Sequence, residues 1–337
     1  MKLSPSILES KIFRRIGVLD PSVIVGPAIG EDASIIDIGD DKVLVVHSDA
    51  ISGSIEMLGW LAVHIAANDI AVRGVRPRWF LISLFIPETS DVISIVDKIS
   101  DQIDRAAKEL GIMVVGGHTE TTTGIDRPLA GMTMIGIGHR NKIVTTSGAR
   151  EGNILIATKA VALEGTSILC TDFAKELIDR GVDTHILERC ARFIEEVSIV
   201  KEALALAEKG LVTSMHDPTE GGVIGGVTEI AYASNKTIEL WLNEIPIREE
   251  TRIICKKLGL DPLRLISSGT LLATVPRDRV EDAINLLKSI GIEARAIGVV
   301  KNRGRCLVEM LRDSNKICIE HVEVEDELFR LIKTYHN

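Results

Sequence analysis

Aromatic residues and the common nucleotide-binding signatures are both scarce in this sequence. Phe, Trp and Tyr make up 3% of the 337 residues, so the cores must be built from Ile, Val, Leu and Ala. The chain contains no G-x-x-x-x-G-K-[ST] phosphate loop, no G-x-G-x-x-G fingerprint, no H-E-x-x-H zinc motif and no G-x-S-x-G nucleophile elbow. The familiar nucleotide-binding and hydrolase folds therefore receive no support.

Cysteine pairs and concentrated positive charge are also missing. The five cysteines are odd in number, widely spaced and never in a C-x-x-C pair, which argues against a zinc site and a disulfide framework. We expect reduced, mostly buried thiols at Cys170, Cys190, Cys255, Cys306 and Cys318. The net charge of −9 without a basic stripe argues against a nucleic-acid partner and favours a small substrate, such as a metal-chelated phosphate.

Long apolar runs are absent as well. The N-terminal sequence MKLSPSILESKIFRRIG has no apolar signal core, and no apolar run approaches the length of a membrane span. These features predict a soluble cytoplasmic protein that has no membrane partner.

The most informative stretch that is present is Leu61–Pro77, LAVHIAANDIAVRGVRP. It predicts a helix that is apolar nearly all round and therefore buried, yet Asn68 and Asp69 lie in its middle. A buried carboxylate needs a partner. Arg73, four residues on, would give an ordinary helical ion pair, and a metal ion or phosphate-bound magnesium is the alternative.

The remaining pattern mixes strands and helices through both halves of the chain, which indicates an α/β or α+β protein. Residues 145–153 (TTSGAREGN) are the best candidate linker, so we expect an N-terminal domain at 1–150 and a C-terminal domain at 151–337. Other expected elements are an amphipathic helix at 4–17, a hairpin at 33–48, a strand at 78–87, a helix at 90–110 and a hairpin formed by CLVEML and ICIEHV.

Three aspartates, Asp32, Asp49 and Asp217, lie beside the ends of predicted elements, and a fourth, Asp69, lies within the predicted buried helix. Magnesium prefers hard oxygen ligands, typically one or two carboxylates together with substrate phosphates. Carboxylates from different elements that converge on one site could hold metal ions against a triphosphate. For Asp32 and Asp49 the alternative is a simple loop or strand-end cap.

Two glycine-containing segments could approach an anion. GGHTE (116–120) follows a predicted strand and is expected to form a turn whose backbone N–H groups face a ligand, or else a plain turn with His118 exposed. MHDPTEGG predicts a helix start with Asp217 as N-cap and Pro218 at the first position, which capping alone could explain. Ser267–Ser268–Gly269–Thr270 is better explained as a plain turn.

In order along the chain, these segments resemble the PurM-like superfamily, which includes aminoimidazole ribonucleotide synthetase, selenophosphate synthetase, thiamine-monophosphate kinase and HypE. GEDASII and HSDAIS resemble its two acidic motifs, and AANDIAVRGVRP resembles the N-D-[IL]-A-x-x-G-x-x-P signature. HDPTEGG and SSGTLLATV are most similar to the HypE branch. The resemblance covers nearly the whole chain, and its specificity comes from the ordered set of motifs.

The resemblance implies an N-terminal sheet domain that dimerises, a C-terminal α/β sandwich domain behind it, and an ATP site held with Mg²⁺ between the domains and the dimer partner. It implies a homodimer that acts on a small-molecule or protein-tail acceptor. The residues that match its motifs are Asp69 and His118 as catalytic candidates, Asn68, Gly116, Gly117, Thr119 and Asp217 as nucleotide contacts, and Asp32, Asp49 and Asp69 as metal ligands.

This sequence departs from the HypE pattern at three places. Its last cysteine is Cys318, whereas HypE carries a C-terminal tail that ends in cysteine; His118 stands where HypE usually has Asp; and Glu220 replaces the Arg of D-P-T-R-G-G. From the resemblance as a whole we expect a HypE-like enzyme that uses Mg-ATP to phosphorylate an oxygen of an unknown acceptor. The alternatives are a small-molecule kinase of the thiamine-monophosphate type and a nucleotide-binding maturation or regulatory subunit without turnover.

Overall fold

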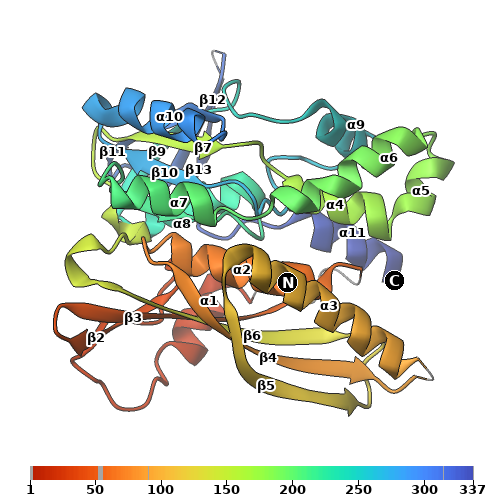
Figure 1. Ribbon diagram of the computed structural model, residues 1–337. Coiled ribbons are helices and arrows are strands. Elements are labelled where there is room, and N and C mark those ends of the chain that lie inside the picture. Colours follow the sequence, from red (N-terminus) through yellow and green to blue (C-terminus); the bar gives the residue numbers. More distant parts are fainter. Residues whose placement is uncertain (1–2, 52–55, 90, 314, 337) are drawn as a thin grey trace.

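Two mixed β-sheets, one in each half of the chain, form the framework of the protein (Figure 1). The computed structural model describes residues 3–51, 56–89, 91–313 and 315–336. Helices and strands alternate throughout, so the predicted mixed α/β class is confirmed. One sheet lies before the predicted linker at 145–153 and the other after it.

The N-terminal sheet has six strands in the order β1-β2-β3-β6-β4-β5. All neighbouring pairs are antiparallel except β4 and β5, which are parallel and joined by the helix α3. The strands are β1 (Val23–Val25), β2 (Ser34–Gly39), β3 (Lys42–Ile51), β4 (Pro77–Pro87), β5 (Met113–Thr122) and β6 (Leu129–His139), and the helices are α2 (Leu58–Ala71) and α3 (Val92–Leu110).

The C-terminal sheet has seven strands in the order β13-β12-β9-β11-β7-β10-β8. Its strands are β7 (Ile154–Thr158), β8 (Ser214–His216), β9 (Lys236–Trp241), β10 (Leu272–Val275), β11 (Ala294–Asn302), β12 (Val308–Arg312) and β13 (Asn315–Ile319). Its helices are α4 (Leu163–Asp172), α5 (Ala174–Asp179), α6 (Thr184–Ala191), α7 (Val200–Glu208), α8 (Gly222–Ala233), α9 (Glu249–Leu258), α10 (Val280–Ser289) and α11 (Glu327–His336).

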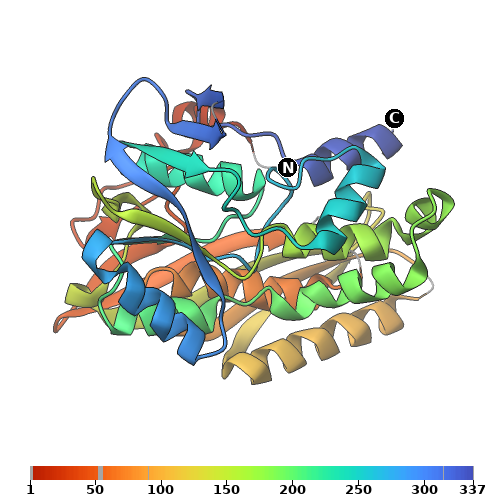
Figure 2. The same cartoon turned by 90° about the horizontal axis from the view of Figure 1, so that it is seen from above.

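Helix α2 is the central element, and all of its residues are buried as its sequence predicts. It packs on the N-terminal sheet along β3, β4 and β6 and against α7 of the C-terminal half. An all-apolar surface suits this position because both sides of the helix are covered. The amphipathic helix α3 follows the margin of the molecule, outside the seven-stranded sheet in the view from above (Figure 2).

The structure corrects two predictions near the chain's ends. The amphipathic helix predicted at 4–17 is limited to α1 (Pro5–Ile7) and a π-helical turn at Leu8–Ile12, and its apolar residues Ile7 and Ile12 remain exposed. The expectation of five reduced thiols is also wrong, because Cys306 and Cys318 form a disulfide. The predicted β12–β13 hairpin brings these two cysteines together, whereas Cys170, Cys190 and Cys255 are buried thiols as expected.

A third correction concerns GGHTE, which is part of a strand and not a turn. Residues 113–122 form β5, an edge strand that pairs only with β4 in the described chain. Gly117 lies so close to β4 that an added Cβ would be 1.9 Å from the carbonyl oxygen of Ile82. Here the glycine allows two strands to approach each other closely.

Among the described residues, no helix combines the length and the apolar character needed to cross a membrane.

We predict that Gly117→Ala weakens the attachment of β5. The new methyl group overlaps the Ile82 carbonyl, so urea unfolding should show a loss of about 1–3 kcal/mol or more. Gly116→Ala is the matched control, because its Cβ would meet only the Leu81 side chain at 3.9 Å. Equal stability of the two variants would contradict this account of β5.

Candidate functional site

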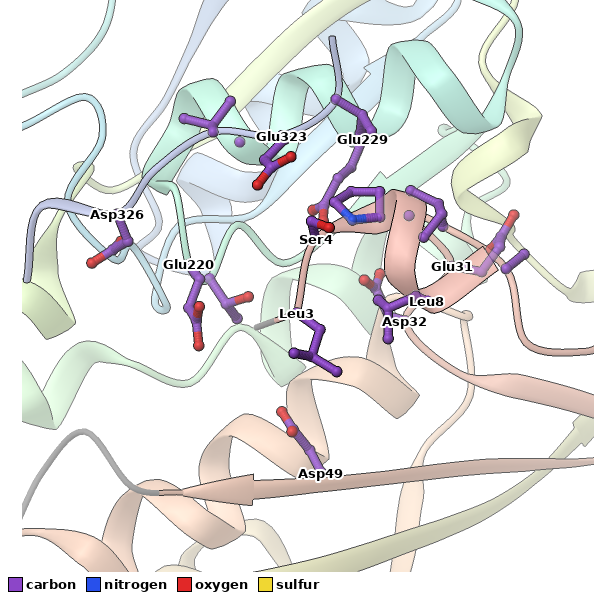
Figure 3. A pocket seen from close by; sticks show the side chains of 18 of the residues that line it. Leu3, Ser4, Leu8, Glu31, Asp32, Asp49, Glu220, Glu229, Glu323 and Asp326 are labelled. Carbon is purple, nitrogen blue, oxygen red and sulfur yellow. The ribbon is translucent and has the colours of Figure 1, made fainter. Parts of the chain in front are cut away.

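A cleft of about 690 Å³ lies at the junction of the two halves. It is lined by the N-terminal segment, the loop before β2, the end of β3, α2, the loop between β8 and α8, α8 itself, and the segment before α11 (Figure 3). Apolar side chains of the N-terminal segment, including Leu3, Leu8 and Phe13, form part of its wall. Its walls also carry ten acidic side chains: Glu31, Asp32, Asp49, Asp69, Asp217, Glu220, Glu229, Glu323, Glu325 and Asp326. Its charged character favours a cationic or metal-bound ligand over a free anion.

The buried guanidinium of Arg73 organises one wall of this cleft. Arg73 is completely buried, and its Nη2 donates to Asp32 Oδ2 at 2.7 Å, to Thr146 Oγ1 at 2.7 Å and to the Met215 carbonyl at 3.1 Å. Its Nη1 pairs with the carboxylate of Glu31. Of the two partners that the sequence offered for Asp69, the ion pair with Arg73 is not supported, because Arg73 pairs with Glu31 and Asp32 and points to the loop before β2 and to β8.

Glu31 extends the same network into the predicted linker. Its carboxylate accepts hydrogen bonds from the backbone N–H groups of Thr146 at 3.1 Å and Ser147 at 3.0 Å. Thr146 is itself completely buried. The start of segment 145–153 is therefore fastened to the loop before β2, although its small and polar residues are typical of a free linker.

His216 is a functional candidate that none of the sequence motifs singled out. Its Nδ1 lies 2.7 Å from Asp32 Oδ1, and its Nε2 lies 2.7 Å from Glu229 Oε2. Burial alone would lower the pKa of His216, but the two carboxylates raise it to about 10. The imidazole is therefore a cation at neutral pH and, together with Arg73, offsets part of the acidic charge of the cleft.

Asp69 and Asp217 form the deepest part of the acidic wall. Asp69 Oδ2 lies 3.1 Å from His47 Nε2, and Asp217 Oδ2 accepts a hydrogen bond from Asn68 Nδ2 at 3.0 Å. The Oδ1 atom of Asp217 is buried without a hydrogen-bond partner among the described residues. Burial, and then the charge of Asp69, raise the pKa of Asp217 well above its ordinary value. A cation at this position would relieve both effects.

Asn68, which its motif predicts to contact the nucleotide, lies behind the wall of the cleft. It is completely buried, and it does not belong to the cleft lining. Its Nδ2 donates to the Val197 carbonyl at 2.9 Å and to Asp217, and its Oδ1 accepts from the Ile199 N–H at 2.9 Å. Asn68 therefore orients Asp217 and ties α2 to the segment before α7.

The start of α8 also differs from the one predicted from the sequence. The helix begins at Gly222 with Gly221 as its N-cap, so Asp217 caps nothing and instead faces the cleft from the loop after β8. Asp49, at the end of β3, is exposed and accepts a hydrogen bond from the Ala50 N–H at 2.7 Å. All four aspartates singled out in the sequence, Asp32, Asp49, Asp69 and Asp217, line the same cleft.

The four β5 residues predicted as site residues lie elsewhere. Gly116, Gly117, His118 and Thr119 are exposed on the edge strand and are not part of the cleft lining. His118 Nε2 is 3.1 Å from Glu120 Oε2 on the same strand. Within one chain the structure does not bring these residues to the aspartates. Among the described residues, no three His, Cys, Asp or Glu side chains are grouped closely enough to hold a metal ion by themselves.

Comparisons with known proteins agree with this architecture. Residues 30–138 match the family model for the N-terminal domain of AIR synthase related proteins, and residues 150–310 match the model for their C-terminal domain. The chain is 28% identical over 307 residues to a putative hydrogenase expression/formation protein of Methanocaldococcus jannaschii, covering 88% of this chain and 87% of that protein. It is 30% identical to the carbamoyl dehydratase HypE of Azotobacter vinelandii, covering 72% of this chain and 69% of that protein.

A solved structure of the hydrogenase maturation protein HypE in complex with ATP has the same fold. It superimposes with a TM-score of 0.72 at 22% identity, covering 97% of this chain and 96% of the other.

We predict that Arg73→Met strongly destabilises the protein. The substitution removes a buried cation and leaves Glu31 and Asp32 without it, so urea unfolding should show a loss of about 3–5 kcal/mol. Arg140→Met is the control, because Arg140 pairs with Asp37 at the surface and should cost less than about 1 kcal/mol. A small effect of Arg73→Met would show that the buried network does not hold the halves together.

Proposed function

The chain belongs to the AIR synthase related, PurM-like family, and on that premise we propose that it is a HypE-like enzyme that uses ATP and Mg²⁺ to phosphorylate an oxygen of an acceptor. The convergence of Asp32, Asp49, Asp69 and Asp217 on one cleft carries the proposal. The terminal phosphoryl group would pass from ATP to the acceptor oxygen, with release of ADP.

The cleft suits a nucleoside triphosphate that is bound together with a metal ion. Its volume of about 690 Å³ lies within the ordinary range of about 300–1,000 Å³ for ligand pockets. A bare triphosphate would be repelled by the carboxylates, whereas a magnesium complex would be attracted. The buried Oδ1 of Asp217 and the raised pKa of this residue fit a nearby cation.

Three of the four aspartates are held by neighbouring side chains. Arg73 and His216 hold Asp32, His47 lies beside Asp69, and Asn68 orients Asp217. In this proposal Asp32, Asp49 and Asp69 would hold the magnesium ion together with the phosphates of the nucleotide, and the ion would neutralise charge on those phosphates. Asp217 faces the nucleotide from the C-terminal half. Fixed carboxylates need no rearrangement when the nucleotide binds.

We further propose that the active form is a homodimer in which β5 meets the partner. β5 is an edge strand whose apolar side chains Met113, Val114 and Val115 are 65%, 40% and 47% exposed. An exposed apolar edge strand is a ready template for pairing. In a dimer, the β5 residues Gly116, Gly117, His118 and Thr119 would meet nucleotide bound at the interface, which explains why one chain does not bring them to its own cleft.

A nucleotide-binding subunit without turnover is the second candidate. The position of His118 favours this candidate. The side chain is exposed and lies beside Glu120 on the same strand, so within one chain it does not line the cleft where catalysis would take place. Incubation of the purified protein with Mg-ATP and candidate acceptors separates the two. Release of ADP with a phosphorylated acceptor supports the enzyme, and tight ATP binding without any product across a wide acceptor screen supports the subunit.

We predict that Asp69→Asn weakens Mg-ATP binding tenfold or more, which corresponds to about 1.4 kcal/mol, because a ligand to the metal is lost. Calorimetric titration measures the affinity, and thermal unfolding monitors the fold. Asp37→Asn is the control, because Asp37 lies on β2 and is not part of the cleft lining. Unchanged affinity with reduced stability would assign Asp69 a structural role.

We predict that Val115→Lys converts the dimer into a monomer, because it places a charge on the apolar edge strand. Light scattering coupled to size exclusion should report a mass near twice 36.7 kDa for the wild type and near 36.7 kDa for the variant. Ile93→Lys, on α3 at an 87% exposed position, should leave the mass unchanged. A wild-type protein of 36.7 kDa would refute the dimer.

A further inference from the structure

A second, much smaller cavity opens beside the acidic cleft. Its volume is about 70 Å³, and it shares Asp49, Thr219 and Glu220 with the cleft. In Figure 3, Asp49 and Glu220 lie on opposite sides of an open space in the cleft. Its inner walls come from α2, α4, α11 and the loop before β10. It is therefore a side pocket of the cleft at the boundary between the two halves.

Glu164, on α4, lines this side pocket, and one of its two carboxylate oxygens lacks a partner in the described part of the chain. The residue is 3% exposed, and its Oε2 atom is buried without a hydrogen-bond partner among the described residues. Burial raises the pKa of Glu164 to about 7, and Ser268 beside it offsets part of this rise. A buried carboxylate oxygen without a partner costs free energy, so its persistence suggests that a ligand completes the site.

The charges around the side pocket define what kind of ligand it takes. The acids Asp49, Glu164 and Glu220 line it, and none of its described lining residues is Lys, Arg or His. Glu220 is the residue at which this chain departs from the resembled D-P-T-R-G-G pattern, so the local charge is more negative than that pattern would give. An anion is disfavoured here, and a cation with N–H donors can satisfy the carboxylates.

The size of the side pocket limits the ligand further. About 70 Å³ holds a group of a few non-hydrogen atoms, and it is too small for a sugar or a nucleobase. Apolar side chains, including Leu61, Ile65 and Ile168, form the rest of the wall. The occupant therefore combines a small apolar stem with a donor-rich head.

The position of α11 is fixed, so this wall is preformed. Asp326 Oδ1 accepts a hydrogen bond from the Leu328 N–H at 2.8 Å, and its Oδ2 accepts one from the Gly221 N–H at 2.9 Å. These bonds tie the first turn of α11, which contributes Leu328 to the pocket, to the loop that carries Glu220. A preformed pocket loses little free energy to ordering when the ligand binds.

We propose that this side pocket binds a small cationic nitrogen group of the acceptor, an amidinium or ammonium, with Glu164 as its principal partner. The inference rests on the proposed function, because it assigns the acceptor to the cavity adjoining the Mg-ATP cleft. The head group is held between α2 and α4, and the rest of the acceptor extends past Asp49 and Glu220 toward the nucleotide. Glu164 is thus a specificity-determining residue.

Three probes of nearly equal shape test the charge of the ligand in the wild-type protein: acetamidinium, acetamide and acetate. Calorimetric or NMR titration should show that acetamidinium binds at least tenfold more tightly than acetamide and that acetate does not bind. Sodium chloride at matched ionic strength controls for screening. Equal affinity for acetamidinium and acetamide, or tighter binding of acetate, would overturn the proposal without any variant.

Variants then locate the binding. Glu164→Gln keeps the size of the side chain and should weaken acetamidinium binding tenfold or more. Ser267→Ala is the matched control, because Ser267 is equally buried beside Ser268 but hydrogen-bonds within the chain to Ala162 and Leu265 and does not line the pocket. It should keep the wild-type affinity even where it loses stability. Undiminished binding by Glu164→Gln would place the cation elsewhere and refute the assignment.

The same titrations separate this inference from the proposed function. Selective acetamidinium binding by a wild-type protein that fails to bind Mg-ATP would refute the proposed function while supporting the cation pocket. Mg-ATP binding together with no preference for acetamidinium would support the proposed function and overturn the cation pocket.

Discussion

A buried cation at the junction of the two halves is the interaction on which the rest of the structure depends. Arg73 emerges from the end of α2, has no solvent exposure and joins Glu31, Asp32, Thr146 and the Met215 carbonyl. These partners belong to the loop before β2, the connecting segment and β8. The two terminal nitrogens of the buried guanidinium meet these partners, whereas its Nε has none among the described residues, so these contacts restrain the relative position of the two sheets.

That constraint also determines the chemistry of the cleft. With Arg73 and the cationic His216 committed to Glu31, Asp32 and Glu229, the other carboxylates of the wall face the cavity without an equal number of cations. The cleft is thus prepared for a ligand that brings positive charge. In our proposals the carboxylates are balanced by magnesium on a triphosphate in the large cleft and by a cationic head group of the acceptor in the side pocket.

The sequence predicted the features that depend on local pattern. An all-apolar stretch predicted the buried helix α2, and the order of the acidic motifs predicted the set of aspartates that line one cleft. It could not predict the partner of Arg73, because the spacing of four residues to Asp69 was visible whereas Glu31 lies 42 residues away. The two glycines of β5 indicated a turn, and only the pairing with β4 shows why Gly117 is needed. The Cys306–Cys318 disulfide was missed because spacing alone did not reveal the hairpin register.

The most direct test of this account is the titration of the wild-type protein with ATP in the presence and absence of magnesium. An acidic cleft that needs a metal ion predicts clear binding with magnesium and at least tenfold weaker binding with excess chelator. Equal affinity in both conditions, or no binding with magnesium, would contradict the claim that the converging aspartates form a metal-dependent nucleotide site.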